Sequence, residues 1–330
     1  MEGKYTIYTP VARAGLGHCL TAITAYANYS SMTGREYLVN AKHRTSFLQN
    51  PSSDLDPFFK TYFDEKSFEG NGIDLSNSRV KSVYDQAGNE NWETLVLVDK
   101  TSDIEQFRKV KLGAEIQGDV RFMLFSKFRK KYFLKQKDHP AKLIVIMVNE
   151  PTKGGRELKK VRDFNSAGSL NPDYSYPDLG NIDLGKCVGI HLRHGNGEYL
   201  HGRLEGDDIK FERYVDRVVR KAQKLAKNEN LDIIAFSDSN KLLARLKKKH
   251  GILILKNENL PDEAWFDHLK SKQKEDKPQV IEKVMQDFYA IANCKHVVCG
   301  LSLFTMAAYF FSKHRSFHLM SQKWRLFRFL

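Results

Sequence analysis

The sequence predicts an α/β fold in which parallel strands alternate with helices. In the second half of the chain, four apolar segments that favour extended backbone alternate with four segments of helical periodicity. The strands are expected at 187–192, 231–236, 251–255 and 295–299, and the helices at about 208–228, 239–250, 280–293 and 302–313. The strand segments lack polar alternation, which is typical of strands buried on both faces of a parallel sheet. This order of elements indicates a sheet covered by helices.

The first half of the chain opens with a similar pattern. A strand at Tyr5–Tyr8 leads through a glycine-containing turn into a helix over 21–29 and a second strand at Tyr37–Val39. Farther along, the expected elements are strands at Thr94–Val98 and Leu143–Val148 and helices near 103–110 and 119–135. The segment E-P-T-K-G-G, residues 150–155, then breaks the pattern, because proline and paired glycines end regular structure.

The length of 330 residues is too great for one ordinary core and predicts two domains. We expect an N-terminal domain over 1–165, a second domain over 180–305, and a C-terminal helix and tail over 306–330. Residues 156–186 are rich in loop-forming residues and are expected to connect the two domains.

The composition is that of a globular protein from a reducing compartment. Hydrophobic residues make up 41% of the chain and aromatic residues 12%, which excludes an intrinsically disordered protein. No apolar run approaches the roughly 20 residues of a membrane-spanning helix, and the N-terminus lacks the apolar core of a signal peptide. The four cysteines form no C-x-x-C pair, so we expect reduced core thiols rather than disulfides or a zinc site. The sequence thus predicts a cytoplasmic protein.

The net charge is +13, and the cationic residues are concentrated in three segments, 126–137, 241–250 and 322–330. The second segment is predicted to be a helix whose lysines form a solvated face. The first and third interleave aromatic and cationic residues, which suits a peripheral contact with an anionic membrane or a lipid-linked acceptor. A solvated surface without function explains each segment equally well. No nucleic-acid-binding motif is present, so no nucleic-acid partner is expected.

The stretch C-V-G-I-H-L-R-H-G-N-G-E, residues 187–198, carries the strongest functional signal. An apolar strand ends here in polar side chains, and in open α/β sheets ligands bind at the carboxyl ends of strands. Arg193 keeps its charge and suits a phosphate, while the two glycines let the backbone approach a ligand. Polar residues at the end of a strand are common and do not by themselves indicate a functional site. The density of titratable and amide groups favours a site built from His191, Arg193, His194, Asn196 and Glu198.

Within this stretch, H-L-R-H-G-N-G-E resembles the first donor-binding motif of the α1,6-fucosyltransferase superfamily. Seven of its eight positions match the form H-V-R-H-G-N-G-E of the rhizobial nodulation fucosyltransferases. Three further segments are similar to other motifs of the family and occur in the family's order: R-A-G-L-G-H-C-L at 13–20, I-I-A-F-S-D-S-N at 233–240, and D-F-Y-A-I-A-N-C-K-H-V-V-C-G-L-S-L-F-T at 287–305.

The resemblance implies a GT-B-type fold, in which two Rossmann-like domains with parallel sheets face each other. It also implies an inverting, metal-independent glycosyltransferase that moves fucose from GDP-fucose to a glycan hydroxyl. In the family, the N-terminal domain receives the acceptor and the C-terminal domain binds the nucleotide sugar. The acceptor expected by analogy is an oligosaccharide ending in N-acetylglucosamine, with a cell-surface or lipid-linked glycan as the alternative. The GDP-sugar is a substrate, and no metal or other cofactor is expected.

The family's donor contacts carry over to matching positions of this sequence. Arg193 and Ser302 correspond to the residues that bind the diphosphate, and His191 and Asp287 correspond to those that contact guanine. The chemistry agrees with these assignments. A departing diphosphate gathers negative charge that a cation and a helix N-terminus can meet, and a carboxylate can accept hydrogen bonds from the N1–H and amine of guanine.

The same motifs imply roles for further residues near the donor. Glu198 is the first candidate for the general base and, with Arg193, completes the expected catalytic pair. His194 and Asn196 are expected in the donor site, and their identities are shared with the nodulation enzymes. Near the ribose or the diphosphate we expect Asp238 and Ser239.

On the acceptor side, the N-terminal glycine-rich segment departs from the family. Gly15 and Gly17 keep the expected shape, whereas His18 stands where the nodulation enzymes have aspartate. His18 either contacts the acceptor or is a helix-start residue without chemistry, and the two interpretations have equal weight.

Three alternatives stay open at this point. In the first, the donor is a nucleotide sugar other than GDP-fucose. In the second, the chain has the same fold but is a non-catalytic basic protein that binds glycans or membranes. A metal-dependent hydrolase would use His191, His194, His201 and Glu198, but their spacing matches no standard zinc pattern.

Overall fold

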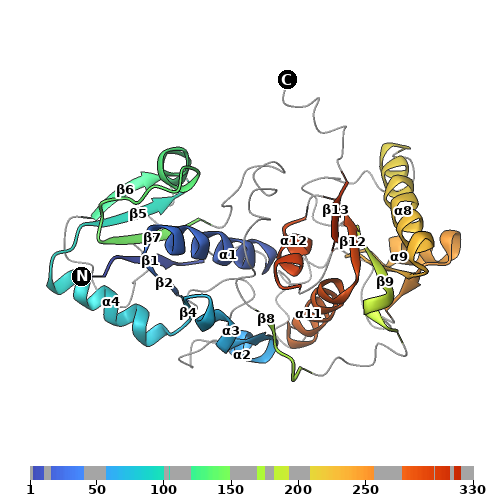
Figure 1. Ribbon diagram of the computed structural model, residues 1–330, viewed down its shortest axis with the longest axis horizontal. Coiled ribbons are helices and arrows are strands. Elements are labelled where there is room, and N and C mark those ends of the chain that lie inside the picture. Colours follow the sequence, from blue (N-terminus) through green and yellow to red (C-terminus); the bar gives the residue numbers. More distant parts are fainter. Residues whose placement is uncertain are drawn as a thin grey trace. The chain divides into compact units, whose positions relative to one another are not determined.

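The computed structural model describes residues 3–10, 16–40, 57–99, 104, 120–148, 169–174, 182–192, 209–255, 277–300, 302–312 and 316–320. The chain divides into two compact units, Met1–Tyr174 and Ser175–Leu330. Each unit contains a main sheet whose strands pair in parallel, together with helices, which confirms the predicted α/β class (Figure 1).

Unit 1 contains a six-stranded parallel sheet in the order β4-β2-β1-β7-β5-β6. Its strands are β1 Tyr5–Tyr8, β2 Glu36–Val39, β4 Ile73–Asp74, β5 Thr94–Val98, β6 Val120–Leu124 and β7 Leu143–Met147. Its helices are α1 Leu16–Thr33, α2 Pro57–Tyr62, α3 Glu65–Gly70, α4 Asn77–Asn89 and α6 Phe125–Phe128, followed by a π-helical turn, η1, at Arg129–Phe133. A separate antiparallel ribbon is formed by β3 Phe63–Asp64 and β8 Ser169–Leu170.

Alternation of side chains along β1 places α1 and α4 on opposite faces of this sheet. Ile7 packs in one core cluster with Tyr84 of α4. On the other face, Tyr8 contacts Tyr26 of α1, with ring centroids 5.4 Å apart. All residues of β7 are buried because both faces of the sheet are covered.

The helix expected over 119–135 is wrong in its first part. Val120–Leu124 forms an edge strand that pairs in parallel with Thr94–Val98, and helical structure begins only at Phe125. Valine and phenylalanine fit a pleated, half-buried surface, and pairing with β5 outweighs the local helical pattern. The expected helix near 103–110 lies outside the described residues except for Ile104.

Unit 2 contains a five-stranded parallel sheet in the order β11-β10-β9-β12-β13. Its strands are β9 Cys187–His191, β10 Asp232–Phe236, β11 Leu253–Ile254, β12 His296–Cys299 and β13 Ser316–Leu319. Its helices are α8 Ile209–Glu229, α9 Asn240–His250, α11 Lys277–Asn293 and α12 Leu303–Phe310, with a short 3-10 turn, η2, at Leu184–Lys186. The four predicted strands and four predicted helices are present, whereas β13 is a strand that the sequence did not lead us to expect.

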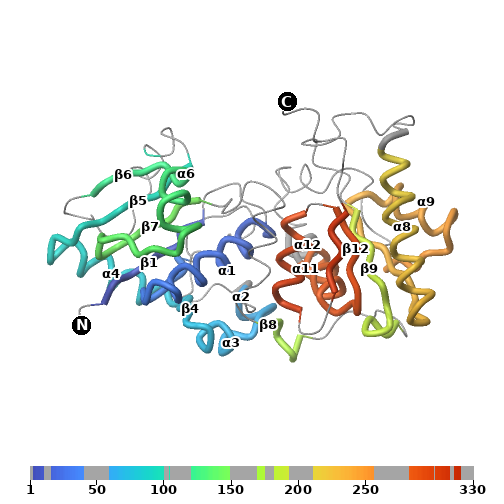
Figure 2. The backbone as a smooth tube through the Cα atoms, turned by 45° about the horizontal axis from the view of Figure 1, so that its top comes forward, coloured from blue at the N-terminus to red at the C-terminus, as the bar shows by residue number. Residues whose placement is uncertain are grey.

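In unit 2, α8 and α9 cover one face of the sheet, and α11 and α12 cover the other (Figure 2). Gly189 in the middle of β9 permits close packing on the α11 side, because a Cβ atom there would lie 3.0 Å from the Sγ of Cys294.

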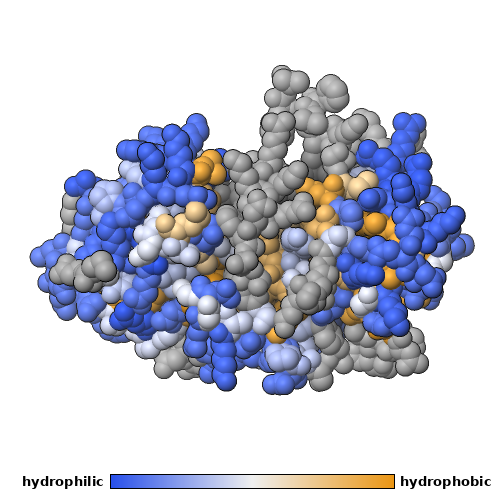
Figure 3. All heavy atoms as spheres, in the orientation of Figure 1, coloured by the Kyte–Doolittle hydropathy of each residue, from blue (hydrophilic) through white to orange (hydrophobic). Residues whose placement is uncertain are grey.

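All four cysteines of the chain are buried free thiols, as the sequence predicted. In the view of Figure 3 the described surface is mostly hydrophilic. Among the described residues, no helix has the length and apolar character to cross a bilayer.

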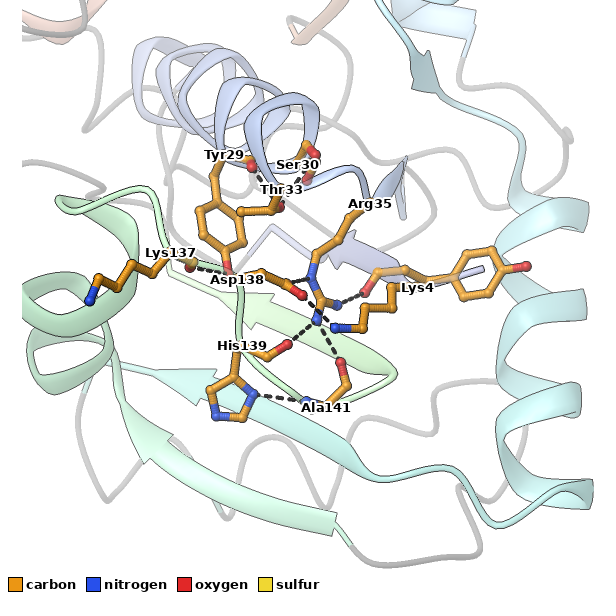
Figure 4. Close-up of polar contacts among 10 residues, drawn as sticks. Lys4, Tyr29, Ser30, Thr33, Arg35, Lys137, Asp138, His139 and Ala141 are labelled. Atoms are coloured by element: carbon orange, nitrogen blue, oxygen red, sulfur yellow. Dashed lines mark hydrogen bonds and ion pairs between the residues drawn. The ribbon is translucent and has the colours of Figure 1, made fainter. Parts of the chain in front are cut away.

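One buried cation ties the amino ends of three strands of unit 1 together (Figure 4). The guanidinium of Arg35, which directly precedes β2, donates to the carbonyl of Tyr5 in β1 at 3.0 Å. It also donates to the carbonyls of His139 and Ala141, both at 2.6 Å, on the approach to β7. Its charge is balanced by Asp138, whose carboxylate accepts from Arg35 Nε at 2.7 Å and pairs with Lys4.

The environment of Asp138 keeps this cluster ionised. Burial alone would raise the pKa of its carboxyl, but the hydrogen bonds from Lys4 and Arg35 outweigh burial and hold the pKa below its usual value. A depressed folded-state pKa means that the stabilising contribution is present at neutral pH and is lost as the pH falls through that value.

We expect Arg35→Met to lower the free energy of unfolding by about 3–5 kcal/mol, because it leaves buried carbonyls and a partly buried carboxylate without a donor. Urea unfolding at neutral pH measures the change. Arg79→Met is the matched control, since Arg79 forms a two-point ion pair with Glu36 at 3.0 and 3.1 Å but both side chains are exposed. Loss of that exposed pair should cost less than about 1 kcal/mol. Equal losses in the two variants would contradict the role given to Arg35.

Candidate functional site

The strand order of unit 2 indicates where a ligand would bind at the carboxyl end of its sheet. From β9 the chain proceeds to β10 and β11 on one side and then returns to β12 on the other side of β9. Strand order therefore reverses between β9 and β12. In open parallel sheets, ligands bind outside the carboxyl ends of the strands at such a point. The residues that end β9 and follow β12 are accordingly the first to consider.

His191 is the last residue of β9 and lies between Phe236 of β10 and Cys299 of β12 in the sheet register. Its side chain is buried and shares a hydrogen bond of 2.6 Å between Nδ1 and the hydroxyl of Thr305 in α12. The ring also packs against Phe304, with centroids 5.8 Å apart. These contacts fix the orientation of the imidazole at the edge of the sheet.

Ser302 begins α12, as the sequence predicted. Its backbone is extended and its hydroxyl accepts a hydrogen bond from the backbone N–H of Thr305 at 3.4 Å, so it is the N-cap of the helix. The side chain is buried. Thr305 thus bonds to Ser302 through its backbone and to His191 through its side chain, which couples the two predicted donor residues.

Asp238 and Ser239 follow β10 at the same edge of the sheet. The hydroxyl of Ser239 caps α9 by accepting from the backbone N–H of Leu242 at 3.2 Å. Its own backbone N–H donates to the hydroxyl of Ser237 at 3.2 Å. Ser239 is buried by these contacts, whereas Asp238 is half-buried.

Asp287 projects from α11 into a poorly solvated environment that it shares with two other charged groups. Burial raises the pKa of its carboxyl to about 6, the cation of Lys283 acts in the opposite direction, and the negative charge of Asp238 raises the pKa further. The interaction between Asp238 and Asp287 places residues from two of the family-like segments in one electrostatic cluster. Phe288, the next residue after Asp287, contacts Phe304, which itself packs on His191.

Two residues that sequence reasoning missed belong to this cluster. Lys283 lies one helical turn before Asp287, is 9% exposed, and its ammonium has no hydrogen-bond partner among the described residues. Burial lowers the pKa of Lys283, while Asp287 opposes that shift. The signal in the sequence is a lysine four residues before an aspartate among apolar helix positions. Thr305 gave no comparable signal, because its bond to His191 joins residues 114 positions apart.

Several predicted site residues cannot be placed. Arg193, His194, Asn196 and Glu198 lie outside the described residues, as does Gly15. On the acceptor side, Gly17 and His18 lie in the first turn of α1, which begins at Leu16. Gly17 is therefore helical rather than part of the turn. Gly17 is buried, whereas His18 is half-buried.

Solved structures with a similar fold are fucosyltransferases. The fucosyltransferase NodZ from Bradyrhizobium matches with a TM-score of 0.52 and 15% identity, over 94% of this chain and 94% of that chain. POFUT1 in complex with GDP matches with a TM-score of 0.54 and 10% identity, over 97% of this chain and 99% of that chain. A NodZ α-1,6-fucosyltransferase soaked with GDP-fucose matches with a TM-score of 0.51 and 16% identity, over 94% and 93% of the two chains.

The chain has the fold of these fucosyltransferases. The resemblance that the sequence motifs carry is thereby confirmed at the level of the fold, over nearly the whole chain. No protein-family model and no curated protein matches the sequence. In the part of the chain that the structure describes, no three His, Cys, Asp or Glu side chains are grouped as metal ligands would be.

The two capping serines allow a test of this local geometry. Ser302→Ala and Ser239→Ala should each lower the free energy of unfolding by about 1 kcal/mol, because each removes an N-cap acceptor. Ser302→Gly should cost only a few tenths of a kcal/mol. Thermal or urea unfolding of the three variants measures these differences. An Ala variant as stable as the wild type would show that the hydroxyl does not cap its helix.

Proposed function

We propose that this chain is a glycosyltransferase whose donor is GDP-fucose. The observation that supports the proposal is the coupling of His191 to the start of α12 through Thr305, beside the reversal of strand order. The chain shares its fold with a NodZ α-1,6-fucosyltransferase that was soaked with GDP-fucose. The reaction proposed is transfer of fucose from GDP-fucose to a glycan hydroxyl, with inversion at the anomeric carbon.

Guanine recognition is assigned to Asp287 and His191. An ionised carboxylate accepts hydrogen bonds from the N1–H and the exocyclic amine of guanine, a donor pair that adenine lacks. Because burial raises the pKa of Asp287 to about 6, the carboxylate is mostly ionised only above that pH. The neighbouring cation of Lys283 favours the ionised form, which is the form that accepts these hydrogen bonds.

Diphosphate recognition is assigned to Arg193 and the N-terminus of α12. Arg193 follows the end of β9 by two residues, and Ser302 caps the helix whose positive dipole end would face a phosphate. Both groups would stabilise the negative charge that develops on GDP as the sugar departs. Asp238 and Ser239 are assigned to the ribose side, and His194 and Asn196 complete the donor site.

The acceptor hydroxyl would attack the anomeric carbon from the face opposite the departing diphosphate. A new carbon–oxygen bond forms while the bond to the phosphate oxygen breaks, and the hydroxyl proton passes to a base. Glu198 is the residue assigned to accept that proton. The proposed mechanism routes no step through a metal. The acceptor side is assigned to Gly15, Gly17 and His18, with an oligosaccharide or lipid-linked glycan as the acceptor.

Calorimetric titration with GDP, GDP-fucose, UDP and ADP in EDTA tests the donor assignment. We expect the wild type to bind only the guanine nucleotides, and Arg193→Ala to weaken GDP binding on the order of 100-fold, because it removes charge-assisted hydrogen bonds. Arg79→Ala, an exposed arginine of unit 1, should bind as the wild type does. Tight UDP binding would overturn the guanine assignment, and absence of any nucleotide binding would favour a non-catalytic binding protein.

The pH dependence of donor binding tests the role of Asp287. Because the ionised carboxylate is the binding form, affinity for GDP-fucose should rise as the pH passes through about 6 and should be roughly tenfold weaker at about pH 5 than at its plateau. GDP-fucose is preferable to GDP because a terminal phosphate has its own pKa near 6. Asp287→Asn should bind weakly at every pH, and Lys283→Met should move the midpoint to higher pH. An unchanged profile in Asp287→Asn would remove this residue from the guanine contact.

A further inference from the structure

Helix α8 carries a straight line of cations along its full length. Arg213, Arg217, Arg220, Lys224 and Lys227 follow one another at alternating steps of four and three residues, so they share one face of the helix. We call these five residues the cationic stripe. The spacing from the first to the last corresponds to about 21 Å along the helix axis.

The stripe points away from the sheet. The opposite face of α8 is packed into the core through residues such as Tyr214, Val218 and Ala222. Four of the stripe residues are exposed, and Arg217 is half-buried, with its guanidinium 6.0 Å from the centre of the Tyr214 ring. The surface over α8 and α9 is mostly hydrophilic in Figure 3.

The acidic side chains of α8 are directed to other partners. These pairs are Glu212 with Arg245 at 2.5 Å, Asp216 with Lys249 at 3.1 Å, and Glu229 with Lys295 at 2.8 Å. Within the described part of the chain, no ion pair reaches a residue of the stripe. Among the described residues, the stripe has one side-chain hydrogen bond, from Arg220 Nε to the backbone carbonyl of Asp216 at 3.2 Å. Like charges three and four residues apart weaken an isolated helix, so this arrangement does not serve helix stability.

The positive surface extends sideways onto α9. Helix α9 is held against α8 by the ion pairs that Glu212 and Asp216 form with it. Its residues Lys241 and Lys248 are exposed. The two helices together contain twelve Lys or Arg and three Asp or Glu, which gives them nine of the chain's thirteen net positive charges. The positive charge is therefore shared by two neighbouring helices.

We propose that the outer face of α8, with the adjoining lysines of α9, docks on an anionic membrane surface. Phosphate and carboxylate headgroups form a two-dimensional array of negative charge, which matches a broad cationic face. The exposed face consists of Arg and Lys side chains, which contact headgroups and do not insert between lipid tails. Docking is thus electrostatic and headgroup-level, and it is independent of the proposed donor.

Vesicle co-sedimentation of the full chain tests the proposal. The wild type should bind phosphatidylcholine vesicles that contain about 30% phosphatidylserine, should not bind pure phosphatidylcholine, and should dissociate as NaCl rises. The triple variant Arg217→Gln, Arg220→Gln, Lys224→Gln should lose roughly 100-fold in partitioning, since three surface charges are removed.

The matched control removes the same charge from the basic segment of unit 1. Lys127→Gln, Lys130→Gln and Lys131→Gln together change exposed lysines beside aromatic residues and should reduce partitioning by no more than about threefold. Circular dichroism and urea unfolding confirm that both triple variants are folded. Equal losses in the two triples, retained binding in the stripe variant, or binding of the wild type to heparin but not to vesicles would each overturn the proposal.

Discussion

The architecture depends on one topological constraint, which is that the first strand of each parallel sheet lies in its interior. β1 lies between β2 and β7, and β9 lies between β10 and β12. Parallel strands are joined by crossover helices. Strands are added on both sides of this first strand, and the helices of the two sets of crossovers lie on opposite faces of the sheet. Both faces are thus covered, and the central strands are buried completely. The same constraint gathers all carboxyl ends at one edge. The amino ends of β1, β2 and β7 in unit 1 are joined instead by a single buried guanidinium, Arg35, which donates to three backbone carbonyls.

At the carboxyl edge of unit 2, stability and ligand chemistry act in opposite directions. A carboxyl group whose pKa is raised to about 6 by burial destabilises the folded protein when it ionises, and Lys283 reduces that cost only by placing a second charge in the same poorly solvated region. A core optimised for stability alone would contain apolar residues at both positions. The pair is explained if a ligand with hydrogen-bond donors completes it, which is the relation expected between Asp287 and guanine.

The sequence predicted central elements better than edges. β5 and β7 consist almost entirely of apolar residues, and burial on both faces makes such runs recognisable without knowledge of their partners. The edge strands β6 and β13 are only partly buried, so their extended backbone is decided by pairing with β5 and β12 rather than by their own pattern. The same limit applies to the site. Ser302 was recognisable as a helix start, whereas the bond between Thr305 and His191 arises only when two distant segments meet in the fold.

The sheet of unit 2 separates Asp287 from the cationic stripe, and this separation limits how strongly the stripe affects the ionisation of Asp287. Asp287 lies on α11, whereas the cationic stripe lies on the outer side of α8, which packs on the opposite face. A sheet and the side-chain layers on each face separate them by about 20 Å, whereas Lys283 lies one helical turn from Asp287. Neutralising the exposed stripe should therefore change the ionisation of Asp287 less than replacing Lys283 does. Salt sensitivity of membrane docking and pH sensitivity of donor binding can then be measured on the same protein as separate properties.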